Sequence, residues 1–196
     1  EHYKLDTKSL DESTLRGLIS NTKVPAEARA KGLDLLVERK PADLTSLLAK
    51  IAVDPANEVA ISALTNLAKS DQKAAIAPLE AAIDSSNAER AQKGWSILTN
   101  IPGAEVDSFF VKHLGALKTL NGKSPSAIEL IEGAKTRKDP AVDAALADFE
   151  KTLAANPDPL VKWNIALEGG DPKNGFSLFT THPGGQCMRC HRASDD

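Results

Sequence analysis

The chain has 196 residues, a formal net charge of -3, and 41% hydrophobic but only 4% aromatic residues. This composition fits a folded protein with an aliphatic core, and it excludes overall disorder and an aromatic-rich β-sandwich. Lysine and arginine do not cluster, which argues against nucleic acid or anionic lipid as a partner. No stretch approaches the ~18–20 apolar residues that a membrane span requires, so we expect none.

From about residue 9 to residue 168, apolar residues recur at helical spacing, and the alternating runs typical of strands are few. Aspartate–proline pairs punctuate the chain at 54–55, 139–140, 158–159 and 171–172. In each pair the aspartate can cap a helix whose first turn holds the proline. The sequence therefore predicts an all-α protein with helix starts at these four pairs.

The predicted helices also repeat every 31 residues. A small residue, a large apolar one and, three positions later, a leucine recur at Gly32, Leu33 and Leu36, at Ala63, Leu64 and Leu67, and at Gly94, Trp95 and Leu98. A second helix is expected after each of these, over 44–51, 76–83 and 106–114. A weaker fourth unit covers 128–133 and 142–153.

One such helix pair cannot bury its apolar stripe alone, whereas a stack of pairs forms a continuous core. The pattern resembles short HEAT-type repeats, whose units are commonly about 40 residues long. We therefore expect a HEAT-like solenoid over residues 1–168, with Trp95 packed in its core. The alternative is an irregular helical bundle, and both architectures imply a scaffold.

Residues 169–196 form a different segment. The repeat pattern stops at Gly169-Gly170, where two glycines suggest a hinge, and Asp171-Pro172 then opens a new amphipathic helix. A turn-rich stretch follows and leads to Cys187-Met188-Arg189-Cys190-His191. The domain boundary is accordingly expected between residues 168 and 169.

The Cys-x-x-Cys-His pattern suits covalent haem attachment, because each thiol can add to one vinyl group while the adjacent imidazole ligates the iron. Cys187 and Cys190 would form the thioethers, and His191 would be the proximal ligand. Two other readings remain. A redox dithiol would normally follow a strand, and none is expected here. A zinc site could use both cysteines with His191 and His182, although ligands at 190 and 191 are awkwardly adjacent for a tetrahedron.

The run EGGDPKNGFSLFTTHPGGQCMRCHR resembles the opening of the c-type cytochrome domain at the C-terminus of large secreted proteins of planctomycete and verrucomicrobial type. Those proteins commonly read GGD, an amphipathic helix, HP and QCxRCH. The resemblance implies covalent haem c, with Phe176 and Phe179 facing it. In that family HEAT-like repeats often precede the cytochrome domain, and a propeller resembling a quinoprotein dehydrogenase, which would be the electron donor, often precedes the repeats.

The sequence ends five residues after His191, whereas such a domain normally continues for many tens of residues and supplies a distal ligand, usually methionine. Met188 lies inside the attachment loop and cannot reach the opposite face of the iron. The remaining candidates are His182, His113, His2, water and a partner chain. His182 is nearest in sequence, but bending it back across the ring would be strained, which favours a turn histidine before Pro183. We expect either a fragment of a longer protein or a partner chain that completes the haem pocket.

No Ser-His-Asp order, phosphate loop or H-E-x-x-H motif occurs, so the chain is not expected to be an enzyme by itself. The first hypothesis is an electron carrier that exchanges electrons with a redox partner or an attached dehydrogenase domain. Because haem is attached covalently outside the cytoplasm, it would be periplasmic or secreted. The rival is a solenoid interaction scaffold with a structural or metal-binding cysteine pair. A third reading, an open haem site with peroxidase-like or gas-binding activity, requires a five-coordinate spectrum.

Overall fold

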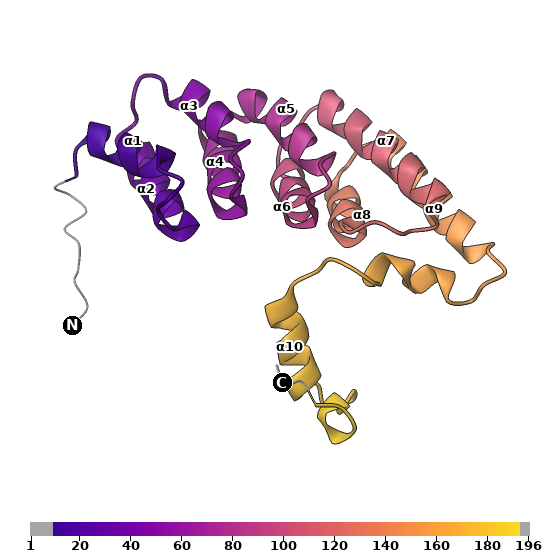
Figure 1. Ribbon diagram of the computed structural model, residues 1–196. Helices are drawn as coiled ribbons and strands as arrows, with labels where there is room; N and C mark the ends of the chain where they lie inside the picture. The colour runs from indigo at the N-terminus through magenta and orange to yellow at the C-terminus, as the bar shows by residue number, and fades with distance from the viewer. Residues whose placement is uncertain (1–9, 193–196) are drawn as a thin grey trace.

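The computed structural model describes residues 10–192, and its helices α1 to α9 form a two-layered stack (Figure 1). One layer consists of α1 (Glu12–Ser20), α3 (Leu44–Ile51), α5 (Gln72–Ile83), α7 (Ala104–Thr119) and α9 (Pro140–Ala154). The other consists of α2 (Ala26–Glu38), α4 (Asn57–Ser70), α6 (Ala88–Leu98) and α8 (Ala127–Thr136). Each even-numbered helix packs against the next one along the stack. The described residues contain no strand, which confirms the all-α helical-repeat prediction.

The repeated small-then-large pattern forms the core. Leu33, Leu64 and Trp95 are each at most 1% exposed. The preceding small residue allows the paired helix to approach closely: a Cβ on Gly32 would lie 2.7 Å from Leu18 Cδ2, and one on Gly94 would lie 2.7 Å from Ile83 Cγ1. The helix approached is the preceding one, α1 for Gly32 and α5 for Gly94. These helices therefore pair as α1/α2 and α5/α6, and the predicted pairing with the helix that follows is wrong here.

Two of the four predicted helix starts are confirmed. Asp139 caps α9 by accepting hydrogen bonds from the N–H groups of Ala141 and Val142, and Asp171 caps α10 (Pro172–Thr181) in the same way. The start predicted at Asp54 is wrong, because α4 begins at Asn57 and the Asp54 carboxylate pairs with the Arg29 guanidinium. The start at Asp158 is also wrong for an α-helix. Only the 3-10 helix η2 (Val161–Ala166) follows it.

Arginine side chains join neighbouring repeats at their turns. Arg29, 4% exposed, donates to the Ile19 carbonyl (2.7 Å) and to the Asp54 carboxylate. Arg137 repeats this arrangement near the other end of the stack. Its Nε lies 2.6 Å from Asp107 Oδ1, and its Nη1 lies 3.2 Å from the Thr99 carbonyl and 2.7 Å from the Ile101 carbonyl.

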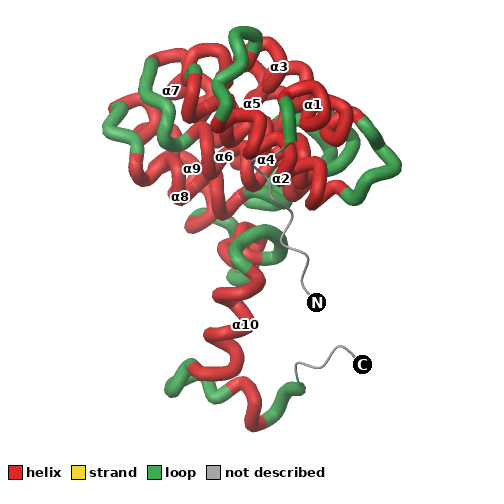
Figure 2. The backbone as a smooth tube through the Cα atoms, turned by 90° about the vertical axis from the view of Figure 1, so that its left-hand side faces the viewer, coloured by secondary structure: helices red, strands yellow, loops and turns green. Residues whose placement is uncertain are grey.

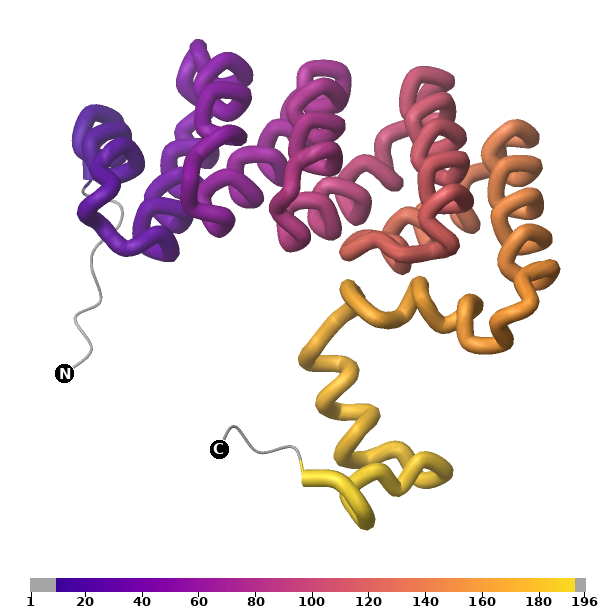
Figure 3. Tube along the Cα trace, turned by 45° about the vertical axis from the view of Figure 1, so that its right-hand side comes forward, coloured from indigo at the N-terminus to yellow at the C-terminus, as the bar shows by residue number. Residues whose placement is uncertain are grey.

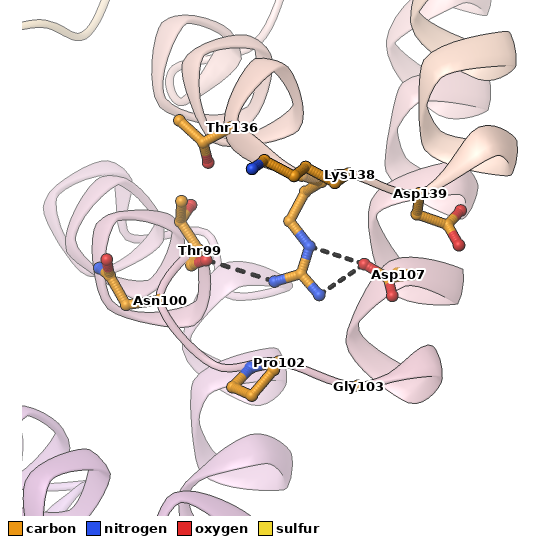
Figure 4. A pocket seen from close by; sticks show the side chains of 9 residues that line it. Thr99, Asn100, Pro102, Gly103, Asp107, Thr136, Lys138 and Asp139 are labelled. Carbon is orange, nitrogen blue, oxygen red and sulfur yellow. Dashed lines mark hydrogen bonds and ion pairs between the residues drawn. The ribbon is translucent and has the colours of Figure 1, made fainter.

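The surface hollow around Arg137 has a volume of about 290 Å³ (Figure 4). Asp107 and Thr99 lie on either side of the guanidinium and receive its hydrogen bonds. Nε and Nη1 of Arg137 already donate to protein oxygens, and Nη2 forms an ion pair with Asp107. We therefore interpret the arginine in this hollow as a link between repeats.

His113 lies in α7 beside the core, where its ring contacts Trp95 and Phe109. Its Nε2 is 3.2 Å from Asp84 Oδ1, and Lys112 Nζ is 3.5 Å from the same carboxylate. Burial lowers the pKa of His113, and Lys112 lowers it further, while Asp84 opposes the shift. His113 is therefore a packed polar residue of the repeats.

The lowered pKa of His113 predicts a stability that falls in mild acid. Below the ordinary histidine pKa of 6.5, the unfolded chain binds a proton that the native protein accepts only at lower pH. The free energy of unfolding should therefore decrease as pH falls through this range, and less so in His113→Gln. Urea unfolding of both chains at about pH 7.5 and about pH 5.5 measures the difference. Equal losses in both would contradict the assignment.

The C-terminal part follows α9 as η2, α10 and the 3-10 turn η3 (Cys187–Arg189). Helix η2 packs against α8 and α9, and α10 then projects away from the stack on the side of the α2/α4/α6/α8 layer (Figures 2 and 3). Within residues 10–192, no helix combines the length and hydropathy of a membrane span. The division into domains 1–168 and 169–196 stays a prediction.

Candidate haem-attachment site

Helix α10 carries the approach to the cysteine pair. Asp171 caps its first turn, where Pro172 requires no hydrogen-bond acceptor, and the helix ends before His182, which precedes Pro183. Its apolar side chains are largely uncovered: Phe176 is 57% and Leu178 50% exposed, while Phe179 is half-buried. Phe176 and Phe179 lie three positions apart and therefore share one helix face. This face can cover a bulky apolar group.

A compact turn joins α10 to the motif. The N–H of Gly185 donates to His182 Nδ1 (2.9 Å), and the N–H of Gln186 donates to the His182 carbonyl (3.2 Å). Gln186 then adopts a left-handed backbone with φ of 44°. The chain thereby reverses immediately before Cys187.

The three motif residues lie on a single turn. The N–H of Cys190 and the N–H of His191 both donate to the carbonyl of Cys187, at 3.2 and 2.9 Å. Both thiols are free; Cys187 is half-buried and Cys190 is exposed. His191 is also exposed. Local backbone hydrogen bonds therefore place the two cysteines and the histidine on one turn, although their three side chains do not converge.

The glycines before the motif leave room for this turn. A Cβ on Gly185 would lie 3.3 Å from Cys187 Sγ and 3.4 Å from His182 Nδ1. His182 therefore lies close to the first cysteine, with one ring nitrogen engaged by the turn. It also lines, with Met188 and Arg189, a surface hollow of about 400 Å³. Its role as distal ligand stays a prediction.

Within residues 10–192, no group of three or more His, Cys, Asp or Glu side chains is arranged to hold a metal ion. The zinc alternative stays a prediction. Of the other ligand candidates, His113 lies in the repeats, and His2 falls outside the described residues. Trp163, next to the segment boundary, is 59% exposed and has Lys162 Nζ 5.3 Å from its ring centroid.

No known family profile and no solved structure matches the chain. A local similarity exists to the methylamine utilization protein MauG of Methylorubrum extorquens, with 43% identity over 61 residues. The aligned region covers 28% of this chain and 17% of MauG. The chain thus spans less than a fifth of that relative.

Proposed function

We propose that this chain is a c-type haem-binding electron-transfer protein, or part of one, in which HEAT-like repeats are the scaffold for the start of a cytochrome c domain. The observation that carries the proposal is the turn that gathers Cys187, Cys190 and His191 with both thiols free. The local similarity to MauG is compatible with a haem-binding redox function.

The residues of the turn fit the chemistry of haem c. Each thiol would add across one vinyl group: a sulfur–carbon bond forms, the hydrogen moves to the neighbouring vinyl carbon, and no oxidant is needed. The His191 imidazole would bind the iron through one nitrogen, as the proximal histidine does in haem proteins. The bound haem would supply one-electron transfer.

Other side chains of the segment would shape the haem environment. Phe176 and Phe179 would pack against the ring and exclude water, which together with burial tunes a haem potential. His182 is the distal candidate within this segment, unless a partner chain completes the pocket. The protein would be periplasmic or secreted. It would be an electron carrier rather than an enzyme, receiving electrons from a redox partner or an attached dehydrogenase domain.

Intact-mass measurement of the acid-denatured chain tests the proposal, combined with a pyridine haemochrome spectrum. The protein must be matured in a host that assembles c-type cytochromes. A thioether-linked haem survives unfolding, whereas a coordinated metal dissociates, so we expect a mass increase of one haem with the haemochrome band. The bare polypeptide mass would overturn the proposal and leave an interaction scaffold with a cysteine pair.

A further inference from the structure

The corner between the repeats and the cysteine-bearing segment lies at Gly169 and Gly170. Both glycines adopt left-handed backbone, with φ of 84° and 82°. This region is readily accessible to glycine and strained for other residues. From sequence, the pair suggests a free hinge. The contacts around the two glycines instead hold them in place on the repeats.

Gly170 is bonded directly to the repeat stack, since its N–H donates to Glu129 Oε1 in α8 at 2.9 Å. Gly169 is enclosed. A Cβ there would lie 3.0 Å from the Pro125 carbonyl oxygen, 3.1 Å from Glu129 Oε2 and 3.5 Å from Gln92 Nε2. Gln92 Nε2 in turn donates to the Pro125 carbonyl at 2.7 Å. The corner is thus seated on a surface formed by α6, α8 and the loop before α8.

A second attachment lies a few residues earlier, on the loop between α7 and α8. Asn164 Nδ2 donates to the Asn121 carbonyl at 2.9 Å. Ile165 packs so closely on Gly122 that a Cβ there would lie 2.9 Å from Ile165 Cγ2. Val161 at the start of η2 is 5% exposed. Because the segment is attached at two separated places, its direction as well as its position is restrained.

Glu129 joins the corner to α8. Its Oε1 accepts the Gly170 hydrogen bond, whereas its Oε2 is buried and accepts none from the part of the chain that the structure describes. Leaving a buried carboxylate oxygen unpaired costs free energy. Glu129 lies in the first turn of α8, where its charge favours the helix N-terminus, and its Oε1 additionally fixes Gly170.

We propose that Glu129 is a positioning residue that locks the Gly169-Gly170 corner and holds the cysteine-bearing segment at one orientation on the repeat stack. Functional groups keep their geometry when a rigid element supports them, and here that element is the stack. The inference rests on the proposed function only in naming haem as the group so positioned. The repeats then act as a rigid arm that sets the distance between the haem and any partner bound by the stack.

Distance measurements between two spin labels test this lock. The labels are placed on exposed lysines, through Lys69→Cys on α4 and Lys173→Cys on α10, in the full chain with Cys187→Ser and Cys190→Ser. The parent should give one narrow distance distribution. Glu129→Ala should broaden it at least twofold, and Glu129→Gln should restore the narrow distribution because its amide oxygen can still accept from Gly170. Glu132→Ala, an exposed position of the same helix, is the matched control.

A distribution in Glu129→Ala as narrow as that in Glu132→Ala would overturn the proposal, and so would a parent that is already broad. Far-ultraviolet circular dichroism shows whether each variant is folded. Because these chains carry no haem, failure of haem attachment and failure of the lock are observed separately.

Glycine substitutions give a second test that leaves Glu129 intact. Gly169→Ala and Gly170→Ala both place a side chain on left-handed backbone, but only the Cβ at 169 would crowd Pro125 and Glu129. The nearest atom to a Cβ at 170 is Ile128 Cδ1, at 3.7 Å. Gly169→Ala should therefore shift the distance distribution more than Gly170→Ala. An equal response of the two variants would contradict the enclosed corner.

Discussion

Replacing Cys187 and Cys190 together with serine is expected to abolish covalent haem attachment. The serine hydroxyl is close in size to the thiol and should leave the turn intact, because backbone groups make its hydrogen bonds. A hydroxyl does not form the thioether, however. In a host that assembles c-type cytochromes, the acid-denatured variant should therefore show the bare polypeptide mass and no haemochrome band.

Three further variants separate the roles of the motif residues. Each single serine variant retains one thiol and should carry haem in lower yield, through one thioether. His191→Ala should retain the covalent mass increase but change the visible spectrum, because iron ligation and attachment are different functions. Met188→Leu is the control inside the loop and should behave as wild type. Full haem retention in the double serine variant after denaturation would refute the assignment.

The Asp54→Ala variant is expected to lose about 3–5 kcal/mol of folding free energy, the usual cost of removing one partner of a buried ion pair. Arg29 is 4% exposed and pairs with Asp54. Truncating Asp54 would therefore leave the Arg29 guanidinium buried without a counter-charge. The Asp54 carboxylate also accepts a hydrogen bond from the Ala56 N–H at 2.9 Å, which the variant loses. Urea unfolding followed by circular dichroism measures the change.

Asp43→Ala is the matched control for Asp54→Ala. Asp43 also pairs with an arginine, Arg16, but this pair is solvent-exposed, and exposed pairs contribute little. A loss in Asp54→Ala no larger than the loss in Asp43→Ala would show that burial of the Arg29 pair is energetically unimportant.

The fold was predictable where local pattern and packing coincide. The repeated pairs Gly32-Leu33, Ala63-Leu64 and Gly94-Trp95 identified α2, α4 and α6. Their large residues fill the core, and the glycines in α2 and α6 make the close helix approach. The aspartate–proline signal failed at Asp54, since the partner of its carboxylate lies 25 residues earlier in Arg29. A capping motif read from neighbouring residues cannot account for such a partner.

At the candidate site, too, the local contacts were predictable from sequence and the distant ones were not. The hydrogen bonds of the turn from Gln186 to His191 join residues at most four apart, so a local motif suffices to specify it. The lock at Gly170 depends on Glu129, 41 residues away along the chain. In the sequence Glu129 resembles any acidic residue on an exposed helix face. Only the stacking of the repeats brings it to the glycine pair.

Side-chain bonds along the stack connect adjacent repeats. Asp34 in α2 accepts from Ser62 and Asn66 in α4, and Lys118 in α7 bonds to Asp148 in α9. Because each repeat contacts only its neighbours, such an array unfolds from its ends inward. Fraying of α1 and α2 would leave the α8 surface in place, whereas fraying of α9 would expose the neighbouring α8 and η2. The support of the cysteine-bearing segment therefore depends on the last repeat much more than on the first.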